Sequence, residues 1–244
     1  MKKLGIVSFV ILCSLLLAAG CSHKPATAAT PQGTDTQAAQ VSDRVDMAAN
    51  DLNALVNAPD SSIPAEIMSK AKCVAVIPDM VKGGFVFGGQ HGRGLASCRN
   101  ANGWSAPAPV ALSGGSWGAQ IGVQSADVVL VFMNDHALAD LLSDKVKLGA
   151  DASIAAGPVG RHAEAATDVA MKSEILSYSR TKGLFAGLTL NGAKVSQDMD
   201  TTAALYGRQV GFREILSGQV QTPAVAAKFT DAVRRDFSEA VAKE

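Results

Sequence analysis

The spacing of hydrophobic residues changes along the chain and predicts helices at both ends. From Val41 to Asn57 apolar residues recur at every third or fourth position, which predicts an amphipathic helix. Its polar face is acidic, with Arg44 as its one basic residue. A helix that lies on a membrane normally carries Lys and Arg, so we expect this helix to pack on its own domain. Pro59 ends it, and a second short helix is expected near Pro64 to Lys72, capped by Ser62.

From Cys73 to Gln197 the pattern changes to short β runs, with a helix inserted over Asp135 to Leu142. Glycine is dense here, since residues 83 to 122 contain 11 of the 23 glycines. Because glycine marks bends and bulges in strands, we expect a curled or barrel-like antiparallel sheet of about seven to nine strands. Turns are expected at Pro78-Asp79, Gly92-Arg93-Gly94, Ser125-Ala126-Asp127, Arg180 to Gly183 and Asn191-Gly192.

Helical spacing returns after Asp198. Helices are expected over residues 200–207, 211–216 and 223–242, and the last of them carries apolar residues at every fourth position. The predicted fold class is therefore α+β, a curled antiparallel sheet flanked by N- and C-terminal helices.

The N-terminus has the pattern of an export signal. Three residues that include two lysines precede an apolar stretch from Leu4 to Ala19, which is too short for a comfortable membrane span. Small residues then lead to Cys21, which resembles the lipobox of bacterial lipoproteins. The resemblance implies cleavage before Cys21, a lipid on its sulfur and, because Ser22 follows, a periplasm-facing position on the outer membrane. An ordinary signal peptide with an incidental cysteine is the alternative.

These features divide the chain into three parts. Residues 1–20 are the expected signal peptide, residues 21–40 the lipidated cysteine and a flexible tether, and residues 41–244 one folded domain. The tether is expected because Ser22 to Gln40 contains no large apolar residue and so cannot bury enough surface to fold. The chain carries 22 basic and 22 acidic residues, and this balance argues against bulk nucleic-acid binding.

Cys73 and Cys98 are the cysteines left in the folded part. In an exported chain such a pair predicts a disulfide, although two buried thiols are the alternative. The expected turn at Gly92 to Gly94 works against the bond, since it places the two cysteines at opposite ends of strands that run the same way. No metal site is expected, because neither cysteine has a partner at ligand spacing.

The sequence matches a hydrolase motif whose expected structural context is missing. Gly114 to Gly118 matches G-x-S-x-G around Ser116, with Asp127 or Asp140 and then His162 following in the order of a catalytic triad. The motif needs a strand, a sharp turn and a helix, whereas the residues after it have a β pattern. We therefore expect no catalysis and no cofactor.

Three basic residues are expected at one rim of the sheet. Counting strand reversals places Lys82, Arg180 and Lys182 in turns at the same end. Such cations could engage lipid phosphates, and ordinary solvated turn charge is the alternative. Trp104 and Trp117 flank one Gly/Pro-rich loop, where they could fill the core or contact a membrane face.

Several segments together resemble the SYLF domain, also called the Ysc-type actin-binding domain. The most specific is Ser177 to Gly187, close to the family pattern S-Y-S-x-T-K-G-L-F-A-G. Supporting segments are Lys82-Gly83-Gly84-Phe85, Trp104-Ser105-Ala106-Pro107, Ala155 to Arg161 and Glu214-Ile215-Leu216-Ser217-Gly218. The resemblance implies binding of anionic phospholipids without catalysis. Some eukaryotic members bind actin, which is not expected for a periplasmic lipoprotein, and the acidic helix at Val41 to Asn57 departs from their basic one.

The resulting hypothesis is a membrane-anchored periplasmic lipoprotein that binds anionic phospholipid membranes. Its anchor is Cys21, and its lipid-binding residues are Lys82, Arg180, Lys182, Trp104 and Trp117. The alternative is a structural or adaptor lipoprotein that binds other envelope proteins. A serine hydrolase that uses Ser116 is a third hypothesis.

Overall fold

The computed structural model describes residues 32–59, 62–84, 87–117, 122–159, 172–181, 184–185 and 190–242. Contacts divide the chain into the units Met1–Pro31 and Gln32–Glu244, and every described residue lies in the second unit. The expected signal peptide and Cys21 lie outside the described residues. None of the described helices has the length and apolar content that a membrane crossing requires.

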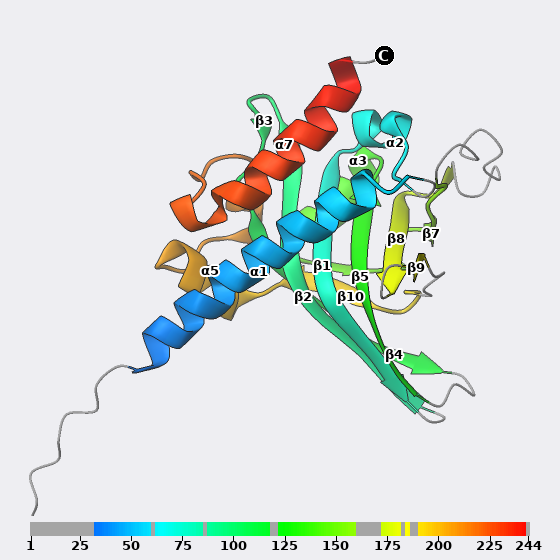
Figure 1. The fold of residues 1–244 in the computed structure, drawn as a ribbon, viewed down its shortest axis with the longest axis horizontal. Coiled ribbons are helices and arrows are strands. Elements are labelled where there is room, and N and C mark those ends of the chain that lie inside the picture. The colour runs from blue at the N-terminus through cyan, green and yellow to red at the C-terminus, as the bar shows by residue number, and fades with distance from the viewer. Residues whose placement is uncertain are drawn as a thin grey trace, which may run out of the picture. The chain divides into compact units, whose positions relative to one another are not determined.

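A curled sheet is the centre of this unit, which confirms the expected α+β class (Figure 1). Within the described residues it has ten strands, of which eight follow the order β6-β10-β4-β2-β1-β5-β8-β7, while β3 pairs with β2 and β9 with β8. All pairs are antiparallel except β7 with β8. The strands are β1 (Cys73–Gly84), β2 (Phe87–Asn100), β3 (Gly103–Trp104), β4 (Ala108–Trp117), β5 (Gly122–Phe132), β6 (Lys145–Lys147), β7 (Ile154–Ala156), β8 (Ile175–Thr181), β9 (Leu184–Phe185) and β10 (Lys194–Gln197).

The helices largely follow the sequence pattern. They are α1 (Gln32–Val56), α2 (Ala65–Lys70), α3 (Asp135–Leu142), α5 (Met199–Tyr206), α6 (Phe212–Leu216) and α7 (Ala227–Ala242), the last preceded by the short 3₁₀ helix η2 (Ala224–Ala226). The bounds of α3 are confirmed, and the side chain of Asn134 caps it by accepting a hydrogen bond from the backbone N–H of Ala137. α1 begins nine residues before the expected start at Val41, so residues 32–40 are helical and not part of a tether. Ser62 does not cap α2, because Pro64 occupies the N-cap position.

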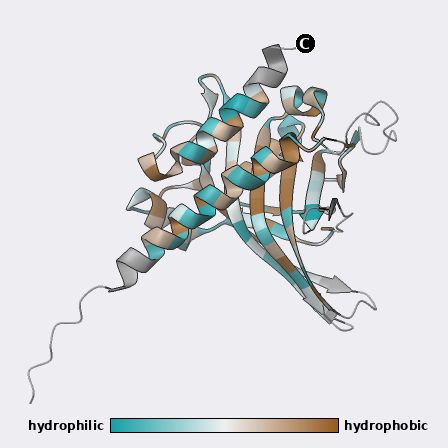
Figure 2. Ribbon diagram, viewed as in Figure 1, coloured by the Kyte–Doolittle hydropathy of each residue, from teal (hydrophilic) through white to brown (hydrophobic). Residues whose placement is uncertain are grey.

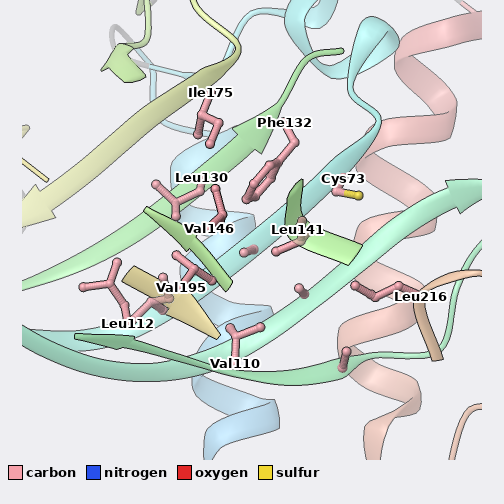
Figure 3. Packing of buried hydrophobic residues seen from close by; sticks show 14 of the residues in the cluster. Cys73, Val110, Leu112, Leu130, Phe132, Leu141, Val146, Ile175, Val195 and Leu216 are labelled. Carbon is pink, nitrogen blue, oxygen red and sulfur yellow. The ribbon is translucent and has the colours of Figure 1, made fainter. Parts of the chain in front are cut away.

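Both faces of the sheet are buried. On the inner face, alternate strand residues pack with α3 and α6, and Figure 3 shows this core around Phe132, Leu130 and Val195. On the outer face, Val74, Val76 and other strand residues pack against α1, α2 and α7. Burial on both faces explains why the central strands β1 and β5 have continuous apolar runs, coloured brown behind α1 in Figure 2.

A β-bulge interrupts β1 where the sequence predicted a turn. Val76 pairs with Leu95 and Val81 with His91, so four residues of β1 lie opposite three of β2. Within this bulge Asp79 has a φ of 45°. Pro78-Asp79 is therefore not a turn between strands, and β1 continues through it to Gly84.

Glycines in β2 make room for the bulge. A Cβ atom on Gly92 would lie 2.5 Å from Cγ2 of Ile77, and one on Gly94 would overlap the carbonyl oxygen of Val76. Any larger residue would push β1 and β2 apart at this point. The turn expected at Gly92 to Gly94 is therefore wrong, because these glycines serve close strand approach within β2. The turn expected at Ser125 to Asp127 is likewise wrong, since these residues lie inside β5.

The continuity of β2 brings the two cysteines together. β2 runs back along β1 without a reversal, so Cys73 and Cys98 are directly opposite, with 4.0 Å between their Cα atoms. They form the expected disulfide, which is fully buried. The geometric objection to the bond came from the wrong turn at Gly92 to Gly94.

We expect the double variant Cys73→Ala/Cys98→Ala to lose about 3 kcal/mol of unfolding free energy, because the disulfide closes a loop that the unfolded chain must otherwise leave open. The two cysteines are 25 residues apart in sequence. Urea unfolding with and without a thiol reductant measures the effect. Reductant should lower the unfolding free energy of the wild type to that of the variant and leave the unfolding free energy of the variant unchanged. Equal stability of the variant and the oxidised wild type would contradict the prediction.

Candidate functional site

Four strands continue past the helices and form what we call the strand extension. It consists of residues 81–84 of β1, 87–91 of β2, 113–117 of β4 and 122–125 of β5. In Figure 1 this part of the sheet projects beyond α1. Backbone pairing holds the four segments together in the order β4-β2-β1-β5. The extension therefore presents two sheet faces without a helix over them.

Two valines stand on the outer face of the strand extension. Val123 pairs with Gly83, which lies two residues after Val81, so both valines are on the same face. Val81 is 46% exposed and Val123 is 81% exposed. Large exposed hydrophobic residues gathered on one projecting surface are typical of a contact site for a membrane or a partner.

Glycines beside these valines leave the neighbouring sheet surface without side chains. Gly115, Gly89, Gly83 and Val123 are successive partners across the four strands. A Cβ atom on Gly115 would meet no atom within 4 Å, and one on Gly89 would meet only a backbone oxygen at 3.9 Å. The Val123 side chain therefore stands above a smooth row of backbone.

Lys82 lies on the opposite face of the same extension. It pairs with Gln90 of β2 and Gln124 of β5, and cross-strand partners share a face. Gln90 is only 3% exposed, and among the described residues neither polar atom of its amide has a hydrogen-bond partner. The extension thus combines one face with exposed valines and one face with polar residues that include a cation.

Arg180 has a structural role that the sequence did not reveal. It belongs to β8 and not to a turn, and its guanidinium lies 3.3 Å from Asp127 and 3.6 Å from Asp51. Asp127 also accepts a hydrogen bond from the backbone N–H of Asp79 in the bulge. These ion pairs link α1 to β5 and β8. Arg180 is therefore not available as a free cation at a rim, and Lys182 lies outside the described residues.

The cluster around Arg180 carries more negative than positive charge. Burial, followed by the nearby charge of Asp127, raises the pKa of Asp51 to about 7, while Arg180 acts in the opposite direction. Ionisation of Asp51 is therefore unfavourable in the folded chain. As far as Asp51 is concerned, folding is therefore most favourable at a pH below this pKa, where the carboxyl group is protonated.

Trp104 is part of the core. Its side chain is 2% exposed and packs edge-to-face on Phe237 of α7, with 5.3 Å between the ring centroids. The Arg99 guanidinium lies 4.9 Å from the Trp104 ring centroid and donates hydrogen bonds to the backbone oxygens of Ala71 and Phe237. A membrane contact for Trp104 is therefore wrong, and the core interpretation holds. The side chain of Trp117 lies outside the described residues.

Ser116 is inside a strand. It pairs with Gly88 of β2 in the middle of a continuous ladder, so no sharp strand-to-helix turn presents it. His162, the third member of the letter pattern, lies outside the described residues. The structure therefore gives no support to a nucleophile elbow at Ser116.

Sequence reasoning missed Val81 and Val123. The expected turns at Pro78-Asp79 and Ser125 to Asp127 hid the fact that both valines extend long strands. The available signal was the cluster of glycines on either side of them at Gly83, Gly84 and Gly122, which indicated strands with little side-chain cover.

The Asp51→Asn variant tests the charge cluster. Between its ordinary pKa and about 7, folded Asp51 holds a proton that the unfolded chain has lost, so its contribution to stability falls as pH rises through this window. Asparagine does not titrate. We therefore expect the variant to gain about 1 kcal/mol of unfolding free energy relative to wild type between about pH 5 and about pH 8, after allowance for solvent screening. Urea unfolding at the two pH values measures this.

The matched control is Asp43→Asn, which changes an exposed aspartate on the same helix. It should leave the pH dependence of stability as in wild type. Identical pH profiles for Asp51→Asn and wild type would contradict the role of the cluster.

Comparisons with known proteins place this fold in a family. The model of the Ysc84 family, described as Las17-binding protein actin regulator, matches residues 113–236, just over half of the chain. The chain is 40% identical over 168 residues to an SH3 domain-containing protein, PJ696.02, of Schizosaccharomyces pombe, covering 67% of this chain and 39% of that protein. It is 34% identical over 171 residues to Protein YSC84 of Saccharomyces cerevisiae, covering 68% and 36%.

A human relative gives the same result. SH3 domain-containing YSC84-like protein 1 of Homo sapiens is 31% identical over 172 residues, covering 70% of this chain and 50% of that protein. The chain thus spans half or less of the length of these relatives. The match to the family model extends from the strand extension through β8 to α7. The chain belongs to the Ysc84 family, whose shared module is the SYLF domain.

Proposed function

We propose that this protein is a non-catalytic, membrane-anchored lipoprotein whose SYLF domain binds anionic phospholipid through the strand extension. The observation that carries the proposal is the pair Val81 and Val123, which expose apolar side chains on one face of a projecting sheet. Lys82 on the same extension supplies a positive charge. Apolar groups that enter a bilayer and cations that meet lipid phosphates act together in membrane binding.

The proposal moves the site from the expected rim to the extension. Arg180 is engaged by Asp51 and Asp127, and Trp104 is buried, so neither can contact lipid without loss of the fold. Lys82, Lys182 and Trp117 remain from the expected set as proposed lipid contacts, and Val81 and Val123 join them. An exposed base adds roughly 1 kcal/mol at an anionic surface. Lys82 is only partly exposed, so binding by the domain alone should be weak. A lipid on Cys21 would make weak binding sufficient, because it keeps the domain close to the membrane.

Removing the exposed valines should weaken vesicle binding. For the purified unit Gln32–Glu244, which forms one compact unit, we expect Val81→Ser/Val123→Ser to bind phosphatidylglycerol-containing vesicles about tenfold more weakly, since about 1–2 kcal/mol of apolar transfer is lost. Lys82→Ala should bind several-fold more weakly and lose part of the salt dependence. Co-sedimentation at rising phosphatidylglycerol content and at two salt concentrations measures both effects.

Matched controls lie elsewhere on the domain. Val225→Ser changes a 44% exposed valine in η2, and Lys145→Ala changes an exposed lysine in β6. Both should bind as wild type does, and circular dichroism checks that all variants fold. Unchanged binding by the double valine variant would refute the extension as the contact site. If the wild type binds no vesicle, the adaptor hypothesis replaces lipid binding.

The anchor has a separate test. The basic and apolar N-terminus followed by Cys21 supports lipidation at this cysteine, and Ser22 supports an outer-membrane position facing the periplasm. We expect the wild type from bacterial membranes to show the mass of an acylated chain that starts at Cys21. Cys21→Ser should lose the acyl mass and leave the membrane fraction. An unchanged mass pattern and location for Cys21→Ser would refute the anchor.

A further inference from the structure

A polar cavity lies at the end of the sheet away from the strand extension. Its volume is about 290 Å³, it is open to solvent, and it is lined by the end of β2, the β2–β3 turn, β3 and the two residues after it, the chain between α6 and η2, and α7. This volume is near the lower end of the range for small-ligand pockets, about 300 Å³. β2 runs from the extension to Asn100 at this cavity, a path of about 40 Å of strand. The two sites are therefore separate surfaces.

The cavity wall carries hydrogen-bonding groups that the fold does not use. Asn102, Gln221, Thr222 and Arg234 line it. No hydrogen bond or ion pair joins the side chains of these four residues to the rest of the described chain, and Arg234 has no carboxylate partner there. Amide and hydroxyl groups both donate and accept hydrogen bonds, whereas the guanidinium only donates. The wall thus offers mixed donors and acceptors beside one positive charge.

Trp104, Ala106 and Val220 also line the cavity. Trp104 and Ala106 are almost fully buried, and within the described residues the indole N–H of Trp104 has no hydrogen-bond partner, so it adds one more unused donor. Phe237 and Arg99 hold the Trp104 ring from two sides. The turn above it is fixed by Asn100, whose side-chain oxygen accepts a hydrogen bond from the backbone N–H of Asn102 at 2.8 Å. The Trp104 ring and the turn are therefore in place before a ligand arrives, whereas the four polar side chains orient on binding.

We propose that this cavity binds an acidic saccharide, a sugar unit that carries a carboxylate. Sugar hydroxyls both donate and accept hydrogen bonds, which matches the amides of Asn102 and Gln221 and the hydroxyl of Thr222. The C–H face of a sugar ring suits the partly buried side chain of Val220. The carboxylate suits Arg234, since a guanidinium binds a carboxylate through two parallel hydrogen bonds. The cavity size limits the bound part to one or two sugar rings.

Other ligands fit less well. Inorganic phosphate would use Arg234 but offers no C–H surface for Val220 and no hydroxyl pattern for the amides of Asn102 and Gln221. An apolar chain would bury the unpaired amides without partners, which costs free energy. The inference does not depend on phospholipid binding, because it uses none of the residues of the strand extension.

Trp104 provides a direct readout of the cavity. The chain has two tryptophans, so Trp117→Phe leaves Trp104 as the single indole. The full-length Trp117→Phe chain, in a detergent without sugar groups, is titrated with trigalacturonic acid, with the neutral trisaccharide maltotriose and with citrate. We expect trigalacturonic acid to change the Trp104 emission with saturation and to bind at least tenfold more tightly than either of the other two compounds. Isothermal titration calorimetry gives the same constants independently.

Two variants on this background test the wall. Arg234→Gln should weaken trigalacturonic acid binding about tenfold and bring it close to that of maltotriose, since a charge-assisted pair is lost. Asn102→Ala should weaken both saccharides several-fold. Both residues are exposed, so the variants should keep the wild-type melting temperature. Arg213→Gln, which changes an exposed arginine on α6 outside the cavity, is the matched control and should bind as the parent does.

Three results would overturn the proposal. The first is the absence of binding by fluorescence and calorimetry for every saccharide. The second is binding that Arg234→Gln and Asn102→Ala leave unchanged. The third is citrate binding as tight as that of trigalacturonic acid, which would make the cavity a site for anions in general. Vesicle binding by the same chain is measured separately, so a failure of one site is distinguishable from a failure of the other.

Discussion

The β-bulge in β1 is the constraint on which the surface of this domain depends. Before the bulge Cys73, Ala75 and Ile77 face the inner core, and after it Met80 faces the same core. The extra residue therefore reverses the alternation, so that Val81 points to the outer face and Lys82 to the inner one. Without the bulge, a strand of period two would exchange the faces of the valine and the lysine. Gly92 and Gly94 of β2 permit the bulge, because neither carries a side chain that would collide with Val76, Ile77 or Met80.

Two polar contacts attach the helices to this sheet. Arg180 joins α1 through Asp51 to β5 through Asp127, and Arg99 joins α2 and α7 to the end of β2 through backbone oxygens and the Trp104 ring. Each arginine is partly buried and contacts several acceptors, so each fixes a direction as well as a distance. Basic residues that a sequence presents as binding groups can thus be needed first for the fold.

The proposed sites use opposite ends of one long strand. β2 begins in the strand extension, where the described surface is glycine and exposed valine, and ends at Asn100 beside the polar cavity. A sheet buried on both faces between these ends is rigid. If the extension rests on a membrane, the cavity at the other end of β2 faces away from it, where a water-soluble saccharide is accessible.

The sequence by itself determined the α+β class, the curled antiparallel sheet, the bounds of α3, the C-terminal helices and the family, because these depend on local periodicity and on motif letters. It also indicated the Cys73–Cys98 bond from the export signal. Only the tertiary structure decided that Gly92 and Gly94 lie within β2, that Arg180 is an internal ion-pair partner and that Trp104 is core. A glycine in a turn and a glycine where two strands approach closely look the same in the sequence. A basic residue likewise looks the same whether it faces lipid or an aspartate. The difference lies in which distant residues come within a few ångströms, and the sequence pattern carries no record of that.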